Sequence, residues 1–345
     1  MRKIFLGAAL AAIALPLSAQ QPARPRSAPE IVKSAPATDW VSISPDDLLV
    51  MTLAPDAQGK PRQVILQLLP PPFSQGWIGN MKKLATAHWW DGGAIYRVQD
   101  NWVAQFGDPD EDTPQAKPLP AGLATVPESE YVSDIDLYVA REKVYSPAVW
   151  QKFYAKRAWQ AKAKLYGGIE HIPLEELGHS SDNDGRGDGY APETGFFEGW
   201  PIASNSEGYW PTHCYATIGV GRNNSPDTGT GAELYAVIGT PPRQLDRNIA
   251  VVGRVIEGIE HLSSLPRAPG NGMYNDKAKN TPIQTIRLAS QLPQADQPRF
   301  QYLSTQSQTF RDYVQARINR RDSFYIYAAG SADICNIPVP IRRAP

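Results

Sequence analysis

One alternating segment, from Trp90 to Pro109 (WDGGAIYRVQDNWVAQFGDP), constrains the fold of this chain more than any other stretch. If the segment is extended, its side chains alternate between two faces, and Arg97 lies on the same face as Ile95. After a turn, Trp102 opens an apolar pair that leads to Gln105 and a Gly-Asp-Pro stop. The pattern predicts a strand that holds a guanidinium beside an aromatic pocket, as an active site would require.

The composition is that of a globular protein. Of the 345 residues, 42% are hydrophobic and 20% are charged, which suffices for one large or two modest domains with a sizeable core. The net charge is -1, and the basic residues are spread along the chain rather than gathered in one stripe. This charge pattern argues against a nucleic acid as partner.

The N-terminal residues have the layout of a secretory signal peptide. Arg2 and Lys3 precede an apolar run that ends in small residues at Ala19, so residues 1–19 are expected to be cleaved off. A short membrane anchor is the alternative, but the apolar run is shorter than the roughly 18 residues that a spanning helix needs. No later segment is apolar enough, so no membrane span is expected after cleavage.

The next residues predict how the folded part begins. Residues 20–39 are rich in Pro, Ala and Ser and lack a repeated apolar face, which predicts a disordered linker. The folded part is expected to begin near Trp40. Two strand-like runs, at residues 47–54 and 62–69, are joined by a turn-like segment and predict a hairpin.

Further motifs occur downstream of the Arg97 segment in a fixed order. They are ATIGVGR at residues 216–222, GAELY at residues 231–235 and LDRNIAVVGRVIEG at residues 245–258. Together these motifs resemble the signatures of the cyclophilin-type peptidyl-prolyl isomerases, and the resemblance covers about residues 46–109 and 214–290. It implies a mainly β fold with helices, in which a closed antiparallel barrel is capped by helices. Residues 62–85 resemble the second strand and first helix of that fold, with Trp77, Met81 and Leu84 expected to face the barrel.

Two parts of the chain lie outside the resemblance. The cyclophilin-like domain is expected at residues 40–292, with a long insertion at about residues 110–213 that contains a helix at Val149–Tyr166. The insertion also carries a loop in which Asp182, Asp184 and Asp188 could bind calcium, although a plain turn is favoured.

The C-terminal extension, residues 293–345, forms the second such part. It is expected to contain an amphipathic helix at Thr309–Arg321 and a short strand-like run at Phe324–Ala328.

The site that the resemblance implies needs neither a cofactor nor a metal. Rotation about an X-Pro amide has a barrier of roughly 18–20 kcal/mol because the nitrogen lone pair is conjugated with the carbonyl. Arg97 would stabilise the twisted amide more than either planar isomer, and Gln105 would orient Arg97. An ion pair between Arg97 and Asp108 is the purely structural alternative. The residues expected to bind the proline-containing peptide are Trp102, Val103, Gly221, Arg222, Glu233, Tyr235, Leu245 and Ile249.

Several positions depart from the family pattern. Ile249 stands where most members have a histidine, and Gln244 stands where many have a tryptophan that contacts cyclosporin. Glu233 replaces a glutamine, and its carboxylate could pair with Arg97 and compete with substrate. A non-catalytic module or chaperone that binds proline segments in the same groove therefore stays open as the alternative to an isomerase.

Export affects the interpretation of the two cysteines, Cys214 and Cys335. In an oxidising compartment disulfides persist, so a bridge between barrel and tail is expected, with two separately buried thiols as the alternative. The expected location is the periplasm, or the medium outside, and the expected partners are proline-containing segments of exported proteins. The five histidines do not cluster in the sequence, and no role is assigned to any of them.

Overall fold

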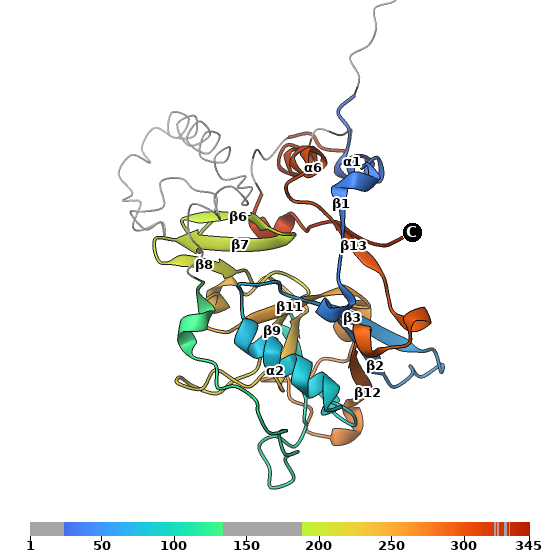
Figure 1. Ribbon diagram of the computed structural model, residues 1–345, viewed down its shortest axis with the longest axis vertical. Coiled ribbons are helices and arrows are strands. Elements are labelled where there is room, and N and C mark those ends of the chain that lie inside the picture. Colours follow the sequence, from blue (N-terminus) through green and yellow to red (C-terminus); the bar gives the residue numbers. More distant parts are fainter. Residues whose placement is uncertain (1–23, 134–187, 321, 323, 328–329, 331) are drawn as a thin grey trace, which may run out of the picture.

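Eight antiparallel strands close into a barrel in the computed structural model, which describes residues 24–133, 188–320, 322, 324–327, 330 and 332–345 (Figure 1). The closed barrel agrees with the fold expected from the sequence motifs. Around the barrel, the strands are β10 (Leu234–Val237), β5 (Val103–Gly107), β4 (Ala94–Val98), β12 (Thr281–Leu288), β2 (Leu48–Leu53), β3 (Arg62–Leu68), β11 (Val251–Glu257) and β9 (Thr217–Val220).

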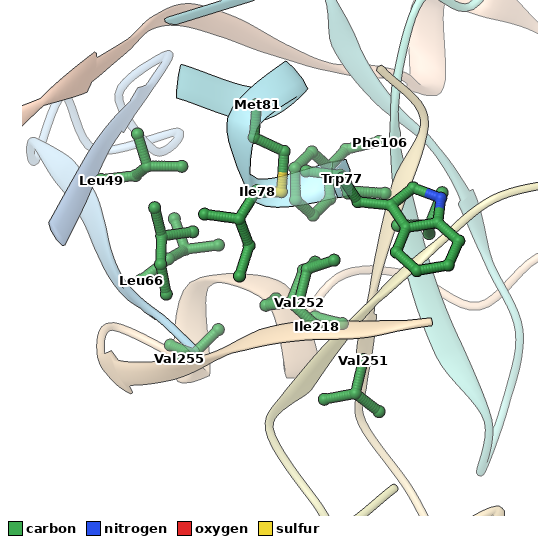
Figure 2. Close-up of a cluster of buried hydrophobic side chains, with 14 of the residues drawn as sticks. Leu49, Leu66, Trp77, Ile78, Met81, Phe106, Ile218, Val251, Val252 and Val255 are labelled. Atoms are coloured by element: carbon green, nitrogen blue, oxygen red, sulfur yellow. The ribbon is translucent and has the colours of Figure 1, made fainter. Parts of the chain in front are cut away.

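Helix α2 (Gln75–Thr86) packs its apolar face into the barrel core (Figure 2). Trp77, Met81 and Leu84 are fully buried there, as their helical spacing predicts. Asn80, on the same helix, donates from Nδ2 to the carbonyls of Ala124 and Thr230 and accepts from the Ala124 N–H. The helix is therefore fixed to two loops as well as to the core.

Strands β2 and β3 form the expected hairpin, and both of their faces are covered. Leu49, Met51 and Leu53 point into the barrel core, while Leu48 and Val50 pack against a second cluster outside it. That second cluster also contains Ile65 of β3, together with Ile43, Ala289 and Phe300 from the segments that flank the barrel on both sides. The near-continuous apolar sequence of β2 thus reflects a strand buried on two sides rather than one.

The two flanking segments fold together into one unit over the barrel. β1 (Trp40–Ser42) pairs with β13 (Phe300–Leu303), which pairs with β14 (Ile341–Arg343). Helices α1 (Ala28–Lys33) and α6 (Gln308–Ile318) lie side by side above this sheet (Figure 1). Helix α6 agrees with the expected amphipathic helix.

The disordered linker predicted for residues 20–39 is wrong for its second half. Ser27 and Glu30 cap α1, since the Ser27 N–H donates to the Glu30 carboxylate at 2.8 Å. Ala28 and Ile31 are then buried in one cluster with Phe310 and Val314 of α6. A helix this short buries too few positions to produce a visible apolar repeat, which is why the sequence concealed it.

A second three-stranded sheet belongs to the insertion and was not expected from the sequence. It consists of β6 (Glu193–Phe197), β7 (Trp200–Asn205) and β8 (Gly208–Pro211). Arg254 of the barrel holds the sheet in place: its guanidinium donates to the Gly199 carbonyl at 2.9 Å and lies 4.1 Å from the centre of the Trp200 ring. The helix expected at residues 149–166 lies outside the described residues.

Two details of the insertion and tail differ from expectation. Asp188 is buried against Arg243, with 2.7 Å between Oδ2 and Nη1, so a structural ion pair occupies this carboxylate, while Asp182 and Asp184 lie outside the described residues. Residues 324–327 form turns and bends rather than a strand, and Phe324, Ile326 and Tyr327 are 82%, 89% and 88% exposed. No strand of the described chain pairs with this run, and β propensity alone does not form a strand without a pairing partner.

Short 3-10 turns and one short helix complete the described chain. They are η1 (Ala37–Asp39), η2 (Pro45–Asp47), η3 (Glu128–Tyr131), η6 (Arg243–Leu245), α5 (Glu260–Ser263), η7 (Lys277–Lys279), η8 (Ala289–Gln291), η9 (Gln294–Asp296) and η10 (Ile334–Asn336). Among the helices of the described ranges, none combines the length and the apolar character that crossing a membrane requires.

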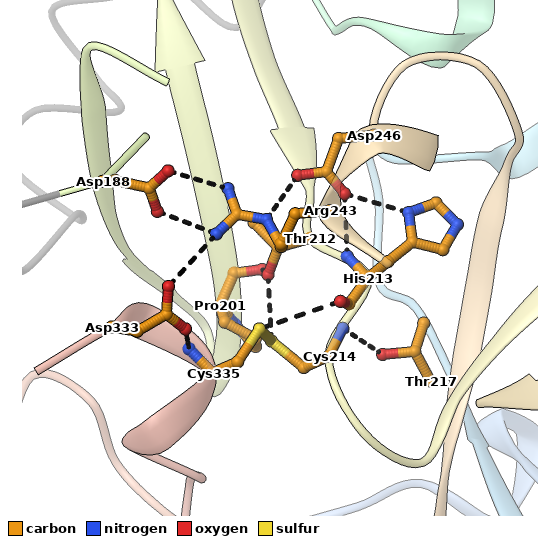
Figure 3. Close-up of a disulfide and its surroundings, with 10 residues drawn as sticks. All are labelled: Asp188, Pro201, Thr212, His213, Cys214, Thr217, Arg243, Asp246, Asp333 and Cys335. Carbon is orange, nitrogen blue, oxygen red and sulfur yellow. Dashed lines mark hydrogen bonds and ion pairs between the residues drawn. A yellow bond between two sulfur atoms is a disulfide. The ribbon is translucent and has the colours of Figure 1, made fainter. Parts of the chain in front are cut away.

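A disulfide joins barrel and tail (Figure 3). Cys214 lies just before β9 and Cys335 lies in η10, with 5.1 Å between their Cα atoms. This separation falls within the range that a disulfide tolerates, about 4.4–6.8 Å. The bridge therefore fixes the C-terminal segment to the edge of the barrel.

Candidate active site

A groove of about 560 Å³ opens on the barrel where β4, β5, β9 and β10 adjoin. Every residue named for catalysis or peptide binding from the sequence lines it. These residues are Arg97, Trp102, Val103, Gln105, Gly221, Arg222, Glu233, Tyr235, Leu245 and Ile249. Further residues that the motifs did not single out, among them Glu111, Asn271 and Met273, complete the lining.

Arg97 reaches the groove through a bulge in β4. The register with β5 shifts between Ile95 and Arg97, because Ile95 lies opposite Phe106 and Arg97 lies opposite Gln105. Ile95 and Val98 are therefore both buried in the barrel core, and Arg97 points away from it. The expectation that Arg97 and Ile95 share one face is wrong, since simple alternation does not hold across a bulge.

The guanidinium of Arg97 is held by three neutral acceptors. Its Nη1 donates to Gln105 Oε1 at 3.0 Å, its Nη2 to Gln99 Oε1 at 2.7 Å, and its Nε to the Asn271 carbonyl at 2.7 Å. Three of the five N–H groups of the side chain are thus used, and two are left for a ligand. Partial burial lowers the pKa of Arg97 from its ordinary value, but an arginine stays charged.

No carboxylate pairs with Arg97 in the part of the chain that the structure describes. Asp108, the partner considered from the sequence, instead accepts hydrogen bonds from the backbone N–H groups of Asp110 and Lys117. Glu233, the other candidate, points to Tyr96 and to the backbone N–H of Asp108. The positive charge of Arg97 therefore faces the groove without a counter-ion.

The hydroxyl of Tyr96 joins Gln105 to the two carboxyl groups. It accepts a hydrogen bond from Gln105 Nε2 at 2.7 Å and lies 2.8 Å from Glu111 Oε1 and 2.8 Å from Glu233 Oε2. A phenol has a single proton, so it can donate to only one of the two carboxyl groups. The other carboxyl group must then carry a proton and donate to the phenol oxygen.

Glu233 is the carboxyl group that carries this proton. Burial, reinforced by the nearby charge of Glu111, raises the pKa of Glu233 to about 8. A neutral Glu233 presents an O–H donor to Tyr96, much as an amide N–H would. The concern that a charged Glu233 draws Arg97 into a salt bridge is thus not supported by the geometry.

An apolar pocket lies beside Arg97 in the groove. Val103 and Tyr235 are buried in a cluster separate from the barrel core, and Trp102, Leu245 and Ile249 pack against them. Tyr235 lies opposite Gln105 in the β10–β5 register, which places the pocket next to the guanidinium. Gln244 is exposed and does not line the groove.

The far wall of the groove is the end of β9. The Gly221 N–H donates to the Glu233 carbonyl at 2.7 Å, which leaves the backbone of this edge close to the Gln105 amide. Arg222 donates from Nε and Nη2 to the Asn248 carbonyl at 3.0 and 2.6 Å. Both residues are thus part of the wall that a bound peptide would run along.

Sequence reasoning missed the loop after β11 and one histidine. The loop brings Asn271 and Met273 alongside β4. Met273 forms an isolated β-bridge with Arg97, and the Val98 N–H donates to the Gly272 carbonyl. His213 lies fully buried behind Tyr235 and forms a hydrogen bond to its hydroxyl. Neither contact has a local sequence signal, since the partners are far apart along the chain.

A closed eight-stranded barrel with an arginine, a glutamine and an apolar pocket in one groove defines a class of cyclophilin-like proteins. The family model for "Cyclophilin type peptidyl-prolyl cis-trans isomerase/CLD" matches residues 77–290, more than half of the chain. The chain therefore belongs to the cyclophilin-type peptidyl-prolyl cis-trans isomerase family.

A solved structure has a similar fold. The cyclophilin AquaCyp293 from Hirschia baltica is 18% identical, with a TM-score of 0.52 over 89% of this chain and 94% of that chain. A cyclophilin-type peptidyl-prolyl cis-trans isomerase from Cryptosporidium parvum, solved in the presence of the dipeptide Ala-Pro, is 9% identical, with a TM-score of 0.34 over 69% of this chain and 98% of that chain. No curated protein sequence matches the chain.

Proposed function

We propose that this protein accelerates cis-trans rotation about X-Pro bonds in unfolded or flexible polypeptides, with Arg97 as the catalytic residue. One observation carries the proposal: the Arg97 guanidinium has no counter-ion in the described chain and lies beside an apolar pocket in a single groove. The pocket, formed by Val103, Tyr235 and their neighbours, has the apolar character that suits a proline ring.

The chemistry follows from the two free N–H groups of Arg97. Donation toward the prolyl nitrogen or the adjacent carbonyl favours the twisted amide, in which the nitrogen lone pair is no longer conjugated. Gln105 and Gln99 fix the guanidinium before substrate arrives, so little reorganisation is needed in the transition state. No nucleophile and no proton transfer is required.

The setting of this activity is also a proposal. A signal-like start at Arg2 and Lys3 and the disulfide between Cys214 and Cys335 both favour an exported protein. We therefore place the protein in the periplasm or outside the cell, where proline-containing segments of other exported proteins would be its substrates. N-terminal sequencing of the protein recovered from the periplasm should start at Gln20; a chain that starts at Met1 would contradict export by cleavage.

A protease-coupled assay on a proline tetrapeptide tests the catalytic role. Arg97→Ala should lower kcat/KM by about 100-fold or more, as expected when a preorganised donor to the transition state is removed. Arg62→Ala is the matched control, because Arg62 lies on β3, its side chain donates to the Ala54 carbonyl, and it is not among the described residues that line the groove. Peptide binding without acceleration by the parent protein would overturn the enzyme and favour a non-catalytic binding module or chaperone.

A further inference from the structure

Figure 3 shows a row of polar side chains, His213, Asp246, Arg243 and Asp188, which are all buried. His213 connects this row to Tyr235 of the apolar pocket. His213 is fully buried, and its Nε2 is 3.0 Å from the Tyr235 hydroxyl. Its Nδ1 is 2.9 Å from Asp246 Oδ1, and its backbone N–H donates to the same oxygen at 2.9 Å. Asp246 Oδ2 in turn accepts from Arg243 Nε at 2.6 Å.

Arg243 determines which groups in this row of hydrogen-bonded side chains donate and which accept. Asp246 pairs with Arg243, whose guanidinium is always charged, so its carboxylate is an acceptor only. The Nδ1 of His213 must then carry the proton that it shares with Asp246. In the neutral imidazole, Nε2 then has a lone pair and accepts a hydrogen bond from the Tyr235 hydroxyl.

The Tyr235 ring is held by apolar packing in the pocket and by the hydrogen bond of its hydroxyl to His213. The ring lies on Gly219 of β9, so closely that a Cβ at this position would be 2.2 Å from the ring carbon Cζ. The His213 ring stacks nearly parallel to it, with 6.4 Å between centroids and 13° between planes. Apolar packing is non-directional, whereas the hydrogen bond to His213 defines one position of the Tyr235 hydroxyl.

We infer that His213 is a positioning residue for the proline pocket: by accepting a hydrogen bond from the Tyr235 hydroxyl, it holds the aromatic wall in the place that receives the proline ring. This inference rests on the proposed function, since it assigns a role at the same groove. His213 contacts no substrate and acts only through Tyr235.

The position of His213 is secured from three directions. The next residue, Cys214, is tied to Cys335 of the tail, whose sulfur is 3.8 Å from the His213 carbonyl. The Arg243 guanidinium also donates from Nη1 to Oδ2 of Asp188, in the insertion, at 2.7 Å. Oδ2 of Asp333, in the tail, lies 4.0 Å from the same Nη1. Insertion and tail thus stabilise the pocket wall from behind, although neither lines the groove at these residues.

A double-mutant cycle tests the inference. His213→Phe keeps a ring of similar size, while Asp246 retains its bonds to the His213 backbone and to Arg243. Both His213→Phe and Tyr235→Phe should raise KM, and the Kd of a proline tetrapeptide, about three- to tenfold, the range for one hydrogen bond, with kcat within about twofold. The double variant should be no worse than either single variant, because both remove the same contact.

Conservative replacement separates positioning from packing. His213→Gln places an amide oxygen where Nε2 was, so it should restore at least half of the lost affinity. His261→Phe, on α5, is the matched control and should leave KM unchanged. Additive effects in the double variant, or a fall in kcat at constant KM, would overturn the inference.

An NMR measurement on the Tyr235 hydroxyl tests the contact with His213 even if the protein has no isomerase activity. The hydroxyl proton of Tyr235 should give a slowly exchanging NMR signal in the parent and in His213→Gln, and none in Tyr235→Phe. If the parent neither binds nor isomerises the peptide but shows this signal, the proposed function fails while the contact stands. If the signal is absent in the parent, or if His213→Phe keeps it, the positioning role is wrong. Should His213→Phe not fold, the signal and the Tyr235→Phe variant still decide the matter.

Discussion

Replacing Glu233 by glutamine should remove a pH dependence of stability that this groove builds into the protein. The pKa of Glu233 is raised from 4.5 to about 8, mainly by burial. Between these two pH values the folded state binds a proton that the unfolded state has released. The free energy of unfolding therefore falls as pH rises through this window: the contribution is fully present below about pH 4.5 and lost above about pH 8.

The magnitude follows from the same pKa values. At 1.36 kcal/mol per pKa unit, a rise from 4.5 to about 8 corresponds to at most about 5 kcal/mol. We expect a measured loss of about 2–3 kcal/mol, because Glu111 shares the titration and the site relaxes once Glu233 ionises. Glu233→Gln keeps both contacts, since an amide can donate to the Tyr96 hydroxyl and accept from the Asp108 N–H.

Urea denaturation of parent and variant at pH 4.5, 6.5 and 8.5 measures the effect. The two proteins should be similar in stability at the lowest pH, and the variant should be more stable by about 2–3 kcal/mol at the highest. Glu128→Gln, at an exposed glutamate of η3, is the control and should follow the parent at every pH. A difference between Glu233→Gln and parent that stays constant with pH, or that grows toward acid, would refute the reasoning.

The disulfide, the pocket and the Asn80 contact each allow a further test. Thiol titration of denatured, unreduced protein should find no free sulfhydryl, and Cys335→Ser should lower the free energy of unfolding by about 2–4 kcal/mol; two reactive thiols per chain would contradict the bridge. Trp102→Ala should weaken binding of a proline peptide by a few kcal/mol at most and leave the fold intact, because Trp102 packs on the pocket cluster outside the barrel core; unfolding would mean a core role. Asn80→Ala should destabilise the protein by about 3 kcal/mol in urea, since three hydrogen bonds of a buried amide are lost; a change below about 1 kcal/mol would show that water replaces them.

The sequence predicted the structure correctly where the contacts are local, or where several motifs follow one another in the order that a known family has. The apolar spacing of Trp77, Met81 and Leu84 predicted the buried face of α2, and the motif order named residues that the fold brings into one groove. Both signals depend on residues within a strand or a helix turn, or on a resemblance that already contains the tertiary structure.

The failures have equally specific causes. The bulge between Ile95 and Arg97 inserts one residue into β4. The alternation of apolar and polar residues in one strand does not reveal a bulge, because a bulge is defined by the pairing with the partner strand. The contact between His213 and Asp246 joins residues 33 apart in sequence, so it follows from the fold and not from spacing. The sheet of β6, β7 and β8 did leave a signal: the turn Glu198-Gly199, with φ of 46° and 83°, is a two-residue hairpin turn between apolar runs.

The pairing of β2 with β12 has a consequence for how this chain folds. Met51 lies opposite Ile286, so the barrel closes only when residues near the start and the end of the domain meet. Contacts of such long sequence separation slow folding, because the loop between them must be ordered first. The fragment 77–290 lacks β2 and β3 and has no means of closing the barrel, so it should remain aggregation-prone when expressed alone. A chain cut short before Thr281 lacks β12 and likewise stays open, so the barrel can close only after β12 has been synthesised.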